Sequence, residues 1–251
     1  MAKAQNKQLH WILPKPKAHI ILKFCYFILP LLVFGCGNDK SEKTTEIIKE
    51  TEQKETPLAA QKKSATLLCF GDSITAGYGL EDENDAFPGL IQKKIDALGL
   101  NYTVINSGLS GETTASGKSR VSWILNQVVD IFLLELGAND GLRGIPLSET
   151  RANLQAIIDS VKAKTPGTII ILAGMELPPN MGQAYTTEFR TIFAELAKKN
   201  DLEFIPFILK DVGGIAELNQ NDGIHPTAEG HAILANTVWD TLEPLINTPS
   251  K

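Results

Sequence analysis

Two short polar motifs, at opposite ends of the part of the chain that we expect to fold, contain the residue types that nucleophilic catalysis needs. Gly-Asp-Ser-Ile-Thr at residues 71–75 follows an apolar run, and Asp-Gly-Ile-His-Pro occupies residues 222–226. A serine hydroxyl is a weak nucleophile until a base takes its proton, and an imidazole is a reliable base when a third group fixes its tautomer. We therefore predict a serine hydrolase with Ser73 as nucleophile, His225 as base and Asp222 as the group that orients it.

Only four histidines are present in the chain, which narrows the choice of base. His10 and His19 lie in a segment that we expect to be removed, so His225 and His231 remain. His231 lies inside a helical stretch six residues after His225, and this spacing favours a place on a helix face over a role as a second base. Among the acids, Asp72 is expected to organise the turn around Ser73.

Two further segments, residues 106–113 and 137–141, are rich in glycine and small polar residues. Each is consistent with an ordinary turn, and Ser73 by itself is consistent with a helix N-cap. In an enzyme, a glycine in the first segment lets a backbone N–H approach the substrate, and Asn139 in the second offers a side-chain amide to an oxyanion. Loss of one such donor typically costs about 3 kcal/mol of transition-state stabilisation.

From about residue 65, short apolar or β-branched runs alternate with longer amphipathic stretches, which is the pattern of a parallel sheet wrapped by helices. Strands are predicted at residues 66–70, 102–106, 131–136, 168–173 and 203–205. Helices are predicted at residues 86–98, 114–127, 148–164, 186–199 and 227–245. In such sheets the ligand crevice lies outside the carboxyl ends of the strands, so the segments that follow the first three strands should meet at one edge.

The four segments match, in order and approximate spacing, the motif blocks of the SGNH hydrolases, also called the GDSL esterase/lipase family. Residues 137–144 and 177–182 resemble its thioesterase I/protease I/lysophospholipase and arylesterase branch. The resemblance covers about residues 66–246. It implies an α/β fold, a three-layer α/β/α sandwich with a flavodoxin-like parallel sheet of about five strands. It also implies that Gly111, together with Ser73 and Asn139, forms the oxyanion hole.

Composition excludes several other functions. Residues 1–36 hold five Lys and no acid, so the rest of the chain has 19 cationic against 29 acidic residues, which argues against a nucleic-acid partner. The spacing of His, Cys and Glu suggests no metal site, and we expect no cofactor. Cys69 lies in the first apolar run and is expected to be a lone buried thiol.

The N-terminal region has the features of a lipoprotein precursor. The apolar stretch at residues 24–35 is too short to cross a bilayer as a helix, which takes about 20 residues, and it suits the hydrophobic part of a signal peptide. The residues before Cys36 resemble a bacterial lipobox, which implies cleavage there and lipidation of that cysteine. An uncleaved signal anchor is the alternative. We expect a signal peptide at 1–35, a lipidated Cys36 with a flexible tether at 36–64, and a hydrolase domain at 65–251.

These observations predict an esterase held at the membrane of the bacterial cell envelope by a lipid anchor, either on the periplasmic face or in the outer membrane. The expected substrates are carboxylic esters and thioesters of small to medium acyl groups, including lipids. Two alternatives remain: a carbohydrate O-acetylesterase, and a non-catalytic binding lipoprotein. The apolar residues Leu80, Phe87, Met181 and Tyr185, in or near two loops expected beside the site, favour acyl chains over sugars. Asp140 and Arg143 could line the pocket or pair with each other.

Overall fold

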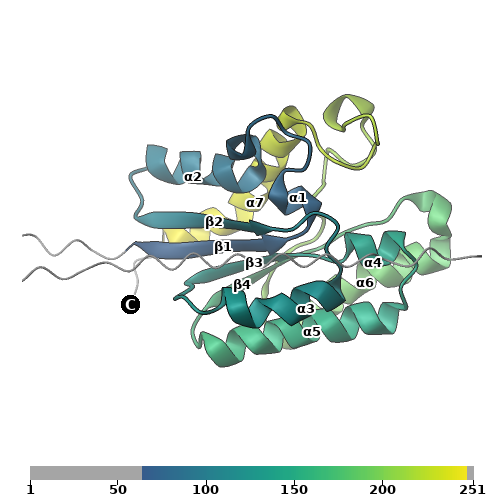
Figure 1. Cartoon of the computed structure of the whole chain (residues 1–251), viewed down its shortest axis with the longest axis horizontal. Helices are drawn as coiled ribbons and strands as arrows, with labels where there is room; N and C mark the ends of the chain where they lie inside the picture. Colours follow the sequence, from purple (N-terminus) through teal and green to yellow (C-terminus); the bar gives the residue numbers. More distant parts are fainter. Residues whose placement is uncertain (1–63, 248–251) are drawn as a thin grey trace, which may run out of the picture. The chain divides into compact units, whose positions relative to one another are not determined.

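A computed structural model describes residues 64–247, which are built around a five-stranded parallel sheet with the strand order β2-β1-β3-β4-β5 (Figure 1). The strands are β1 (Ala65–Gly71), β2 (Tyr102–Gly108), β3 (Ile131–Glu135), β4 (Ile169–Ala173) and β5 (Glu203–Ile205). Because β1 lies between β2 and β3, the chain leaves it first towards one edge of the sheet and later towards the other. A crevice is expected outside the carboxyl ends of the strands at such a switch point.

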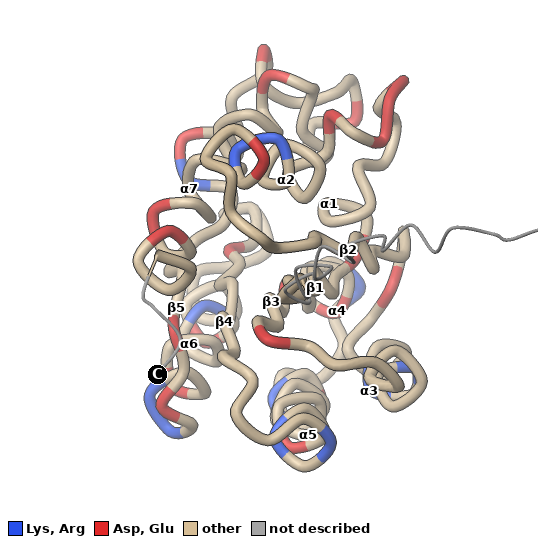
Figure 2. The backbone as a smooth tube through the Cα atoms, turned by 90° about the vertical axis from the view of Figure 1, so that its left-hand side faces the viewer, with Lys and Arg blue, Asp and Glu red and all other residues tan. Residues whose placement is uncertain are grey.

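Helices cover both faces of this sheet. They are α1 (Ser73–Ala76), α2 (Phe87–Ala97), α3 (Thr114–Ile124), α4 (Ala138–Leu142), α5 (Leu147–Lys164), α6 (Gln183–Asn200) and α7 (Ala228–Ile246). Short 3-10 turns lie at Glu83–Asp85, Pro179–Met181 and Ala216–Leu218. Figures 1 and 2 place α2 and α7 on one face and α3 and α5 on the other, where α6 packs beside α5. This arrangement confirms the predicted α/β class and three-layer sandwich.

Strands β1 and β3 are mainly apolar, which suits a sheet whose two faces are both covered by helices. All five residues of β3 are buried, and so are the last five of β1. Phe70 of β1 and Phe132 of β3 lie with their ring centroids 5.5 Å apart. Cys69 is buried with a free thiol, as predicted, and burial together with the charge of Glu135 raises its pKa far above the ordinary value. This thiol is therefore an inert part of the core.

The observed elements differ from the predicted ones mainly in how they end. Helix α3 ends at Ile124, three residues before the predicted end at residue 127, because the chain must turn there to reach β3. Asp130 completes that turn by exchanging two hydrogen bonds with Thr66, through its carboxylate and its backbone N–H. Helices α1 and α4 were not predicted, since four or five residues are too few to show a helical period.

No helix among residues 64–247 has both the length and the apolar character needed to cross a membrane. The predicted signal peptide, Cys36 and nearly all of the predicted tether lie outside the described residues.

Candidate active site

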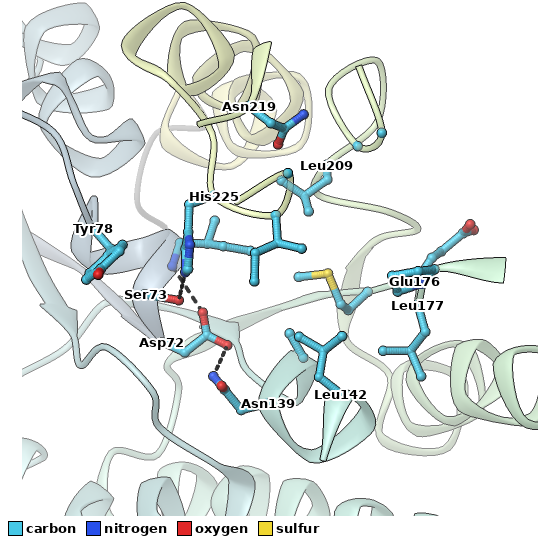
Figure 3. A pocket seen from close by; sticks show the side chains of 18 of the residues that line it. Asp72, Ser73, Tyr78, Asn139, Leu142, Glu176, Leu177, Leu209, Asn219 and His225 are labelled. Atoms are coloured by element: carbon cyan, nitrogen blue, oxygen red, sulfur yellow. Dashed lines mark hydrogen bonds between the residues drawn. The ribbon is translucent and has the colours of Figure 1, made fainter. Parts of the chain in front are cut away.

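The first three strands deliver three polar segments to one edge of the sheet (Figure 3). Ser73 begins α1 directly after β1, Gly111 lies in the loop after β2, and Asn139 lies in α4 after β3. All three line the same cavity, together with His225 from the segment before α7. The convergence predicted from strand order is thus observed.

The turn after β1 is organised by Asp72, as the sequence suggested. Its side chain accepts a hydrogen bond of 3.1 Å from the backbone N–H of Ile74, which makes Asp72 the N-cap of α1. The alternative interpretation of Ser73 as that cap is therefore wrong. Ser73 is the first residue of the helix, and its hydroxyl is left for another partner.

That partner is His225, whose Nε2 lies 2.9 Å from the Ser73 Oγ (Figure 3). The other ring nitrogen, Nδ1, lies 2.7 Å from Asp222 Oδ2. Partial desolvation acts to raise the pKa of Asp222, but hydrogen bonds from the backbone of Ile224 and from the ring and backbone of His225 outweigh it and hold the pKa at about 2. An ionised Asp222 only accepts, so Nδ1 carries the proton and the Nε2 lone pair faces the serine.

The loop that contains Asp222 and His225 is held in place by Gln220, which lies outside the sequence motifs. The backbone N–H of Gln220 donates to the His225 carbonyl at 2.7 Å. Its side-chain amide donates to the carbonyls of Tyr78 at 2.6 Å and Pro226 at 3.0 Å. The Tyr78 ring in turn lies 4.7 Å from the His225 ring, centroid to centroid. Gln220 therefore ties the histidine loop to the end of α1, across more than 140 residues of sequence.

Asn139 and the loop around Gly111 lie against the turn of Ser73. The Asn139 amide nitrogen donates to Asp72 Oδ2 at 3.3 Å and to the Glu112 carbonyl at 3.1 Å. Gly111 has a φ of +79°, a left-handed conformation that favours glycine. Both positions lie beside the serine, where donors to an oxyanion would be needed.

A buried ion pair, which was not predicted from the sequence, supports this loop. Arg120 of α3 binds both carboxylate oxygens of Glu112 through its Nε, at 2.7 and 2.9 Å. Its Nη2 also donates to the carbonyl of Ser107 at 2.8 Å, and its guanidinium lies 4.0 Å from the Phe70 ring centroid. Glu112 is almost fully buried. One side chain of α3 thus joins the ends of β1 and β2 to the loop that contains Gly111.

Asp140 and Arg143 neither line the cavity nor pair with each other. Asp140 is fully buried and accepts hydrogen bonds from the backbone N–H of Thr114 at 2.8 Å and from the hydroxyls of Thr114 and Thr150. It therefore fixes α4 against the start of α3. Arg143 is exposed and bonds to Gly111 and Asn139.

Two buried carboxyl groups lie beneath the serine turn. Glu135, at the end of β3, accepts from the Thr75 hydroxyl at 2.7 Å and from the backbone N–H of Asp72 at 3.4 Å, both through Oε2. Its Oε1 is buried without a hydrogen-bond partner among the described residues. Burial first, and the nearby Asp72 second, raise the pKa of Glu135 well above its usual range. Burial also raises the pKa of Asp72 to about 6.

The cavity in front of Ser73 has a volume of about 480 Å³ and is mainly apolar. It runs from the serine past the carboxyl ends of β3, β4 and β5, so that side chains from all three regions form its wall. The apolar side chains that line it are Ile74, Tyr78, Ala138, Leu142, Met175, Leu177, Pro178, Pro179, Phe207, Leu209 and Ile224. A site of this shape suits an uncharged, apolar group attached to a reacting carbonyl.

The side chains predicted to shape this pocket do not line it. Phe87 is buried in the core, and the hydroxyl of Tyr185 donates to the carbonyl of Gly141 at 3.2 Å. Leu80 and Met181 also lie outside the lining. The loops that contain or adjoin them do contribute Tyr78 and Leu177, but much of the remaining apolar wall comes from segments that the sequence did not single out.

His231 is a helix residue, as predicted, and it is buried between α7 and α2. Its Nδ1 accepts from the backbone N–H of Phe87 at 3.2 Å. Burial first, and the charge of His225 second, lower its pKa to about 4. It does not line the cavity, and no three His, Cys, Asp or Glu side chains within residues 64–247 form a group that could hold a metal ion.

Comparisons with known proteins show the family to which this chain belongs. The GDSL-like Lipase/Acylhydrolase family matches residues 69–233. The chain is 37% identical to "Esterase TesA" of Pseudomonas aeruginosa over 190 residues, which is 75% of this chain and 93% of that protein. It is 36% identical to "Arylesterase" of Vibrio mimicus, over 73% of this chain and 91% of that one. It is 34% identical to "Thioesterase 1/protease 1/lysophospholipase L1" of Escherichia coli K12, over 74% and 86%.

Solved structures show the same likeness in three dimensions. The crystal structure of TesA superposes with a TM-score of 0.69 at 37% identity, covering 72% of this chain and 99% of that one. Esterase EstA from Pseudoalteromonas, in a structure inhibited by monoethylphosphonate, gives a TM-score of 0.69 at 31% identity, covering 74% and 100%. With a family match over most of the folded part and esterases as its relatives, this chain belongs to the GDSL-like Lipase/Acylhydrolase family and is an ester-hydrolysing enzyme.

Proposed function

We propose that this serine esterase works through an acyl-enzyme on Ser73. The observation that carries this assignment is the continuous hydrogen-bonded chain from Ser73 Oγ to His225 Nε2 at 2.9 Å and from His225 Nδ1 to Asp222 at 2.7 Å, at the edge of an apolar cavity. Ser73 Oγ bonds to the carbonyl carbon of the ester while its proton moves to Nε2. Asp222 keeps the ring oriented and stabilises the imidazolium that forms.

The negative charge that develops on the carbonyl oxygen is stabilised by three donors: the backbone N–H groups of Ser73 and Gly111 and the side-chain amide of Asn139. When the intermediate collapses, the bond to the leaving oxygen or sulfur breaks, and His225 returns the proton to the leaving group. Water then attacks the acyl-enzyme with His225 as base, which releases the acid and restores the serine hydroxyl.

The acyl group occupies the apolar cavity in this proposal. A volume of about 480 Å³ and a wall of Leu, Met, Phe and Ile side chains support small to medium acyl groups over sugar rings, which need many hydrogen-bonding partners. Glu176, the acid at the far part of the lining, is paired with Arg190 at 3.6 Å.

We further propose that the protein is a lipoprotein of the bacterial cell envelope, anchored to a membrane through Cys36. The support is the short apolar stretch before Cys36 and the charged, polar stretch after it, which leave residues 65–251 as the hydrolase domain behind a tether at 36–64. A triacylated cysteine would hold such a protein firmly, whereas one acyl chain anchors only marginally.

The catalytic assignment is tested with a series of p-nitrophenyl esters of increasing acyl length, a thioester, a lysophospholipid and an acetylated sugar. We expect kcat/KM to peak at small to medium acyl lengths and to be lowest for the acetylated sugar. Ser73→Ala and His225→Ala should abolish hydrolysis, while His231→Asn should retain it. Phosphonate labelling should map to Ser73, and labelling of Ser107 or Ser110 instead would refute the assignment.

A further inference from the structure

Arg143 connects the two loops that carry the proposed oxyanion donors. One nitrogen of its guanidinium, Nη2, donates to the backbone carbonyl of Gly111 at 3.0 Å and to the side-chain oxygen of Asn139 at 3.2 Å. These two acceptors belong to segments that follow different strands, β2 and β3. Since Nη2 has two hydrogens, it can bond to both acceptors at once.

The bond to Asn139 decides which way its amide faces. A guanidinium has donors and no acceptor, so it selects the amide oxygen as its partner. The opposite side of the amide meets two acceptors, the Asp72 carboxylate and the Glu112 carbonyl, which select the NH₂ group. If the amide turned over, an NH₂ group would face the guanidinium and an oxygen would face a carboxylate. Arg143 therefore helps to keep the NH₂ group of Asn139 directed towards Asp72 and the serine turn.

The bond to the Gly111 carbonyl restrains a residue that can adopt many backbone conformations. Gly111 has a φ of +79°, and a Cβ built there would meet only the Arg143 Nη2, at 3.6 Å. Glycine loses more conformational freedom on ordering than other residues, so a fixed partner for its carbonyl matters. The backbone N–H of the same residue is the proposed oxyanion donor.

The position of Arg143 is itself fixed by Asn139. Arg143 is the C-cap of α4, and its backbone N–H donates to the Asn139 carbonyl at 3.2 Å. The side chain then folds back over one helical turn to reach the amide of the same residue. No carboxylate among the described residues lies within ion-pair distance of Arg143, so nothing there draws the guanidinium away.

We propose that Arg143 is a positioning residue that aligns the Gly111 and Asn139 donors for the oxyanion. This inference rests on the proposed function, because it assumes that these two residues stabilise the transition state. Arg143 acts through its neighbours and not on the substrate, so its removal should lower turnover while leaving substrate binding nearly unchanged.

The test is a double-mutant cycle between positions 143 and 139 with an ester substrate that saturates the enzyme. Removing one oxyanion donor typically lowers kcat by about 10² to 10³, and misaligning a donor should cost less, so we expect Arg143→Ala to lower kcat by about 10- to 100-fold with KM changed less than about threefold. In the Asn139→Ala background the same change should cost much less, because the amide that Arg143 orients is already absent.

Arg143→Lys retains the charge and can offer a donor, but its ammonium is a point donor on a flexible stem, so it should restore kcat only in part. Arg151→Ala is the matched control, since it removes a partly exposed cation that is paired with Glu195 and lies outside the cavity lining, as does its partner. It should leave kcat within about twofold of the wild type. Thermal unfolding of each variant, compared with Arg143→Lys, separates lost alignment from lost folding.

Three outcomes would overturn the inference: an equal loss in the wild-type and Asn139→Ala backgrounds, a change confined to KM, or a kcat for Arg143→Ala equal to that of Arg151→Ala. Failure of the proposed function would look different. Then Asn139→Ala alone would leave kcat unchanged, whatever the result at position 143.

Discussion

At the scale of single residues, the site combines carboxyl groups whose pKa values are shifted in opposite directions. Asp222 is partly exposed and ionised, because N–H groups of its own turn hold its pKa at about 2. Glu135 is fully buried, and its pKa is raised well above the usual range. Asp72, buried between the serine turn and Asn139, has a pKa of about 6. Asp222, which orients His225, therefore stays ionised over the pH range in which Asp72 and Glu135 titrate.

The first prediction at this scale concerns Glu135→Gln. A carboxyl group whose pKa is higher in the folded than in the unfolded protein binds more protons when folded, so it makes the free energy of unfolding fall as pH rises from about 4.5. A glutamine can keep accepting from the Thr75 hydroxyl and does not titrate. The stability of the variant relative to the wild type should therefore increase as pH rises from 4.5 towards the raised pKa of Glu135.

Urea unfolding of both proteins at several pH values measures this difference. Asp72 is present in each protein, but it interacts with Glu135, so the difference between the curves reports the titration of the two carboxyl groups together. A stability difference that stays constant across the whole range would mean that Glu135 titrates normally in the folded protein.

At the scale of elements, helix α2 is capped at its N-terminus by a side chain of another helix, α7. Helix α2 begins after Ala86, which has no side chain able to cap it. The backbone N–H of Phe87 is instead bonded by Nδ1 of His231 from α7, 144 residues away. A helix N-terminus needs such acceptors, because its first N–H groups have no partner within the helix. Protonation of His231 would replace that acceptor with a donor.

The prediction at this scale is a loss of stability in mild acid that depends on His231. Its folded pKa of about 4 lies below the ordinary value of 6.5, so the unfolded chain binds the extra proton between these values. The free energy of unfolding should fall as pH drops from about 6.5 to 4, by up to about 3 kcal/mol from this residue. His231→Asn keeps an acceptor at a similar position without titrating, and it should remove this part of the acid sensitivity.

Denaturant unfolding of wild type and His231→Asn between pH 4 and 7 gives the two slopes. Enzymatic activity at pH 7 serves as the control and should remain, because His231 lies outside the cavity. Parallel curves for the two proteins would show that the acid sensitivity comes from other groups.

At the scale of the whole molecule, the first described residues lie at the opposite end of β1 from the catalytic serine. Residues 64 and 65 lie at the amino end of β1, where Ala65 donates its backbone N–H to the carbonyl of Asn101. Ser73 lies beyond the carboxyl end of the same strand (Figure 1). Among residues 64–247, those that line the cavity all lie between Asp72 and His225. Changes before residue 64 should therefore leave the catalytic geometry intact.

This separation leads to the last prediction, which concerns Cys36. Intact mass spectrometry of the mature wild-type protein should show an N-terminus at Cys36 with the added mass of diacylglyceryl and acyl groups. Cys36→Ser should block lipidation and signal cleavage at this site, and a shortened chain beginning near Ser64 should hydrolyse esters with wild-type kcat and KM. An unmodified mature chain that begins at Met1 would exclude the lipoprotein proposal.

The fold class, the family and the residues that meet around Ser73 could all be predicted from the sequence. Strand positions follow from apolar runs that are buried on both faces, and the four motif blocks place Ser73, Gly111, Asn139 and His225 after particular strands or before the last helix. Both signals are local, since periodicity and motif chemistry belong to neighbouring residues. They therefore need no knowledge of how distant segments pack.

The side-chain contacts that hold these residues in place are known only from the folded structure. The bond from Arg143 to the Gly111 carbonyl joins positions 32 residues apart, and the bond from the Phe87 N–H to His231 joins positions 144 residues apart. The cavity wall likewise combines segments after β1, β2, β3, β4 and β5. Such contacts depend on the order of strands in the sheet and on side-chain directions, because residues that are far apart in sequence meet only when the sheet has formed.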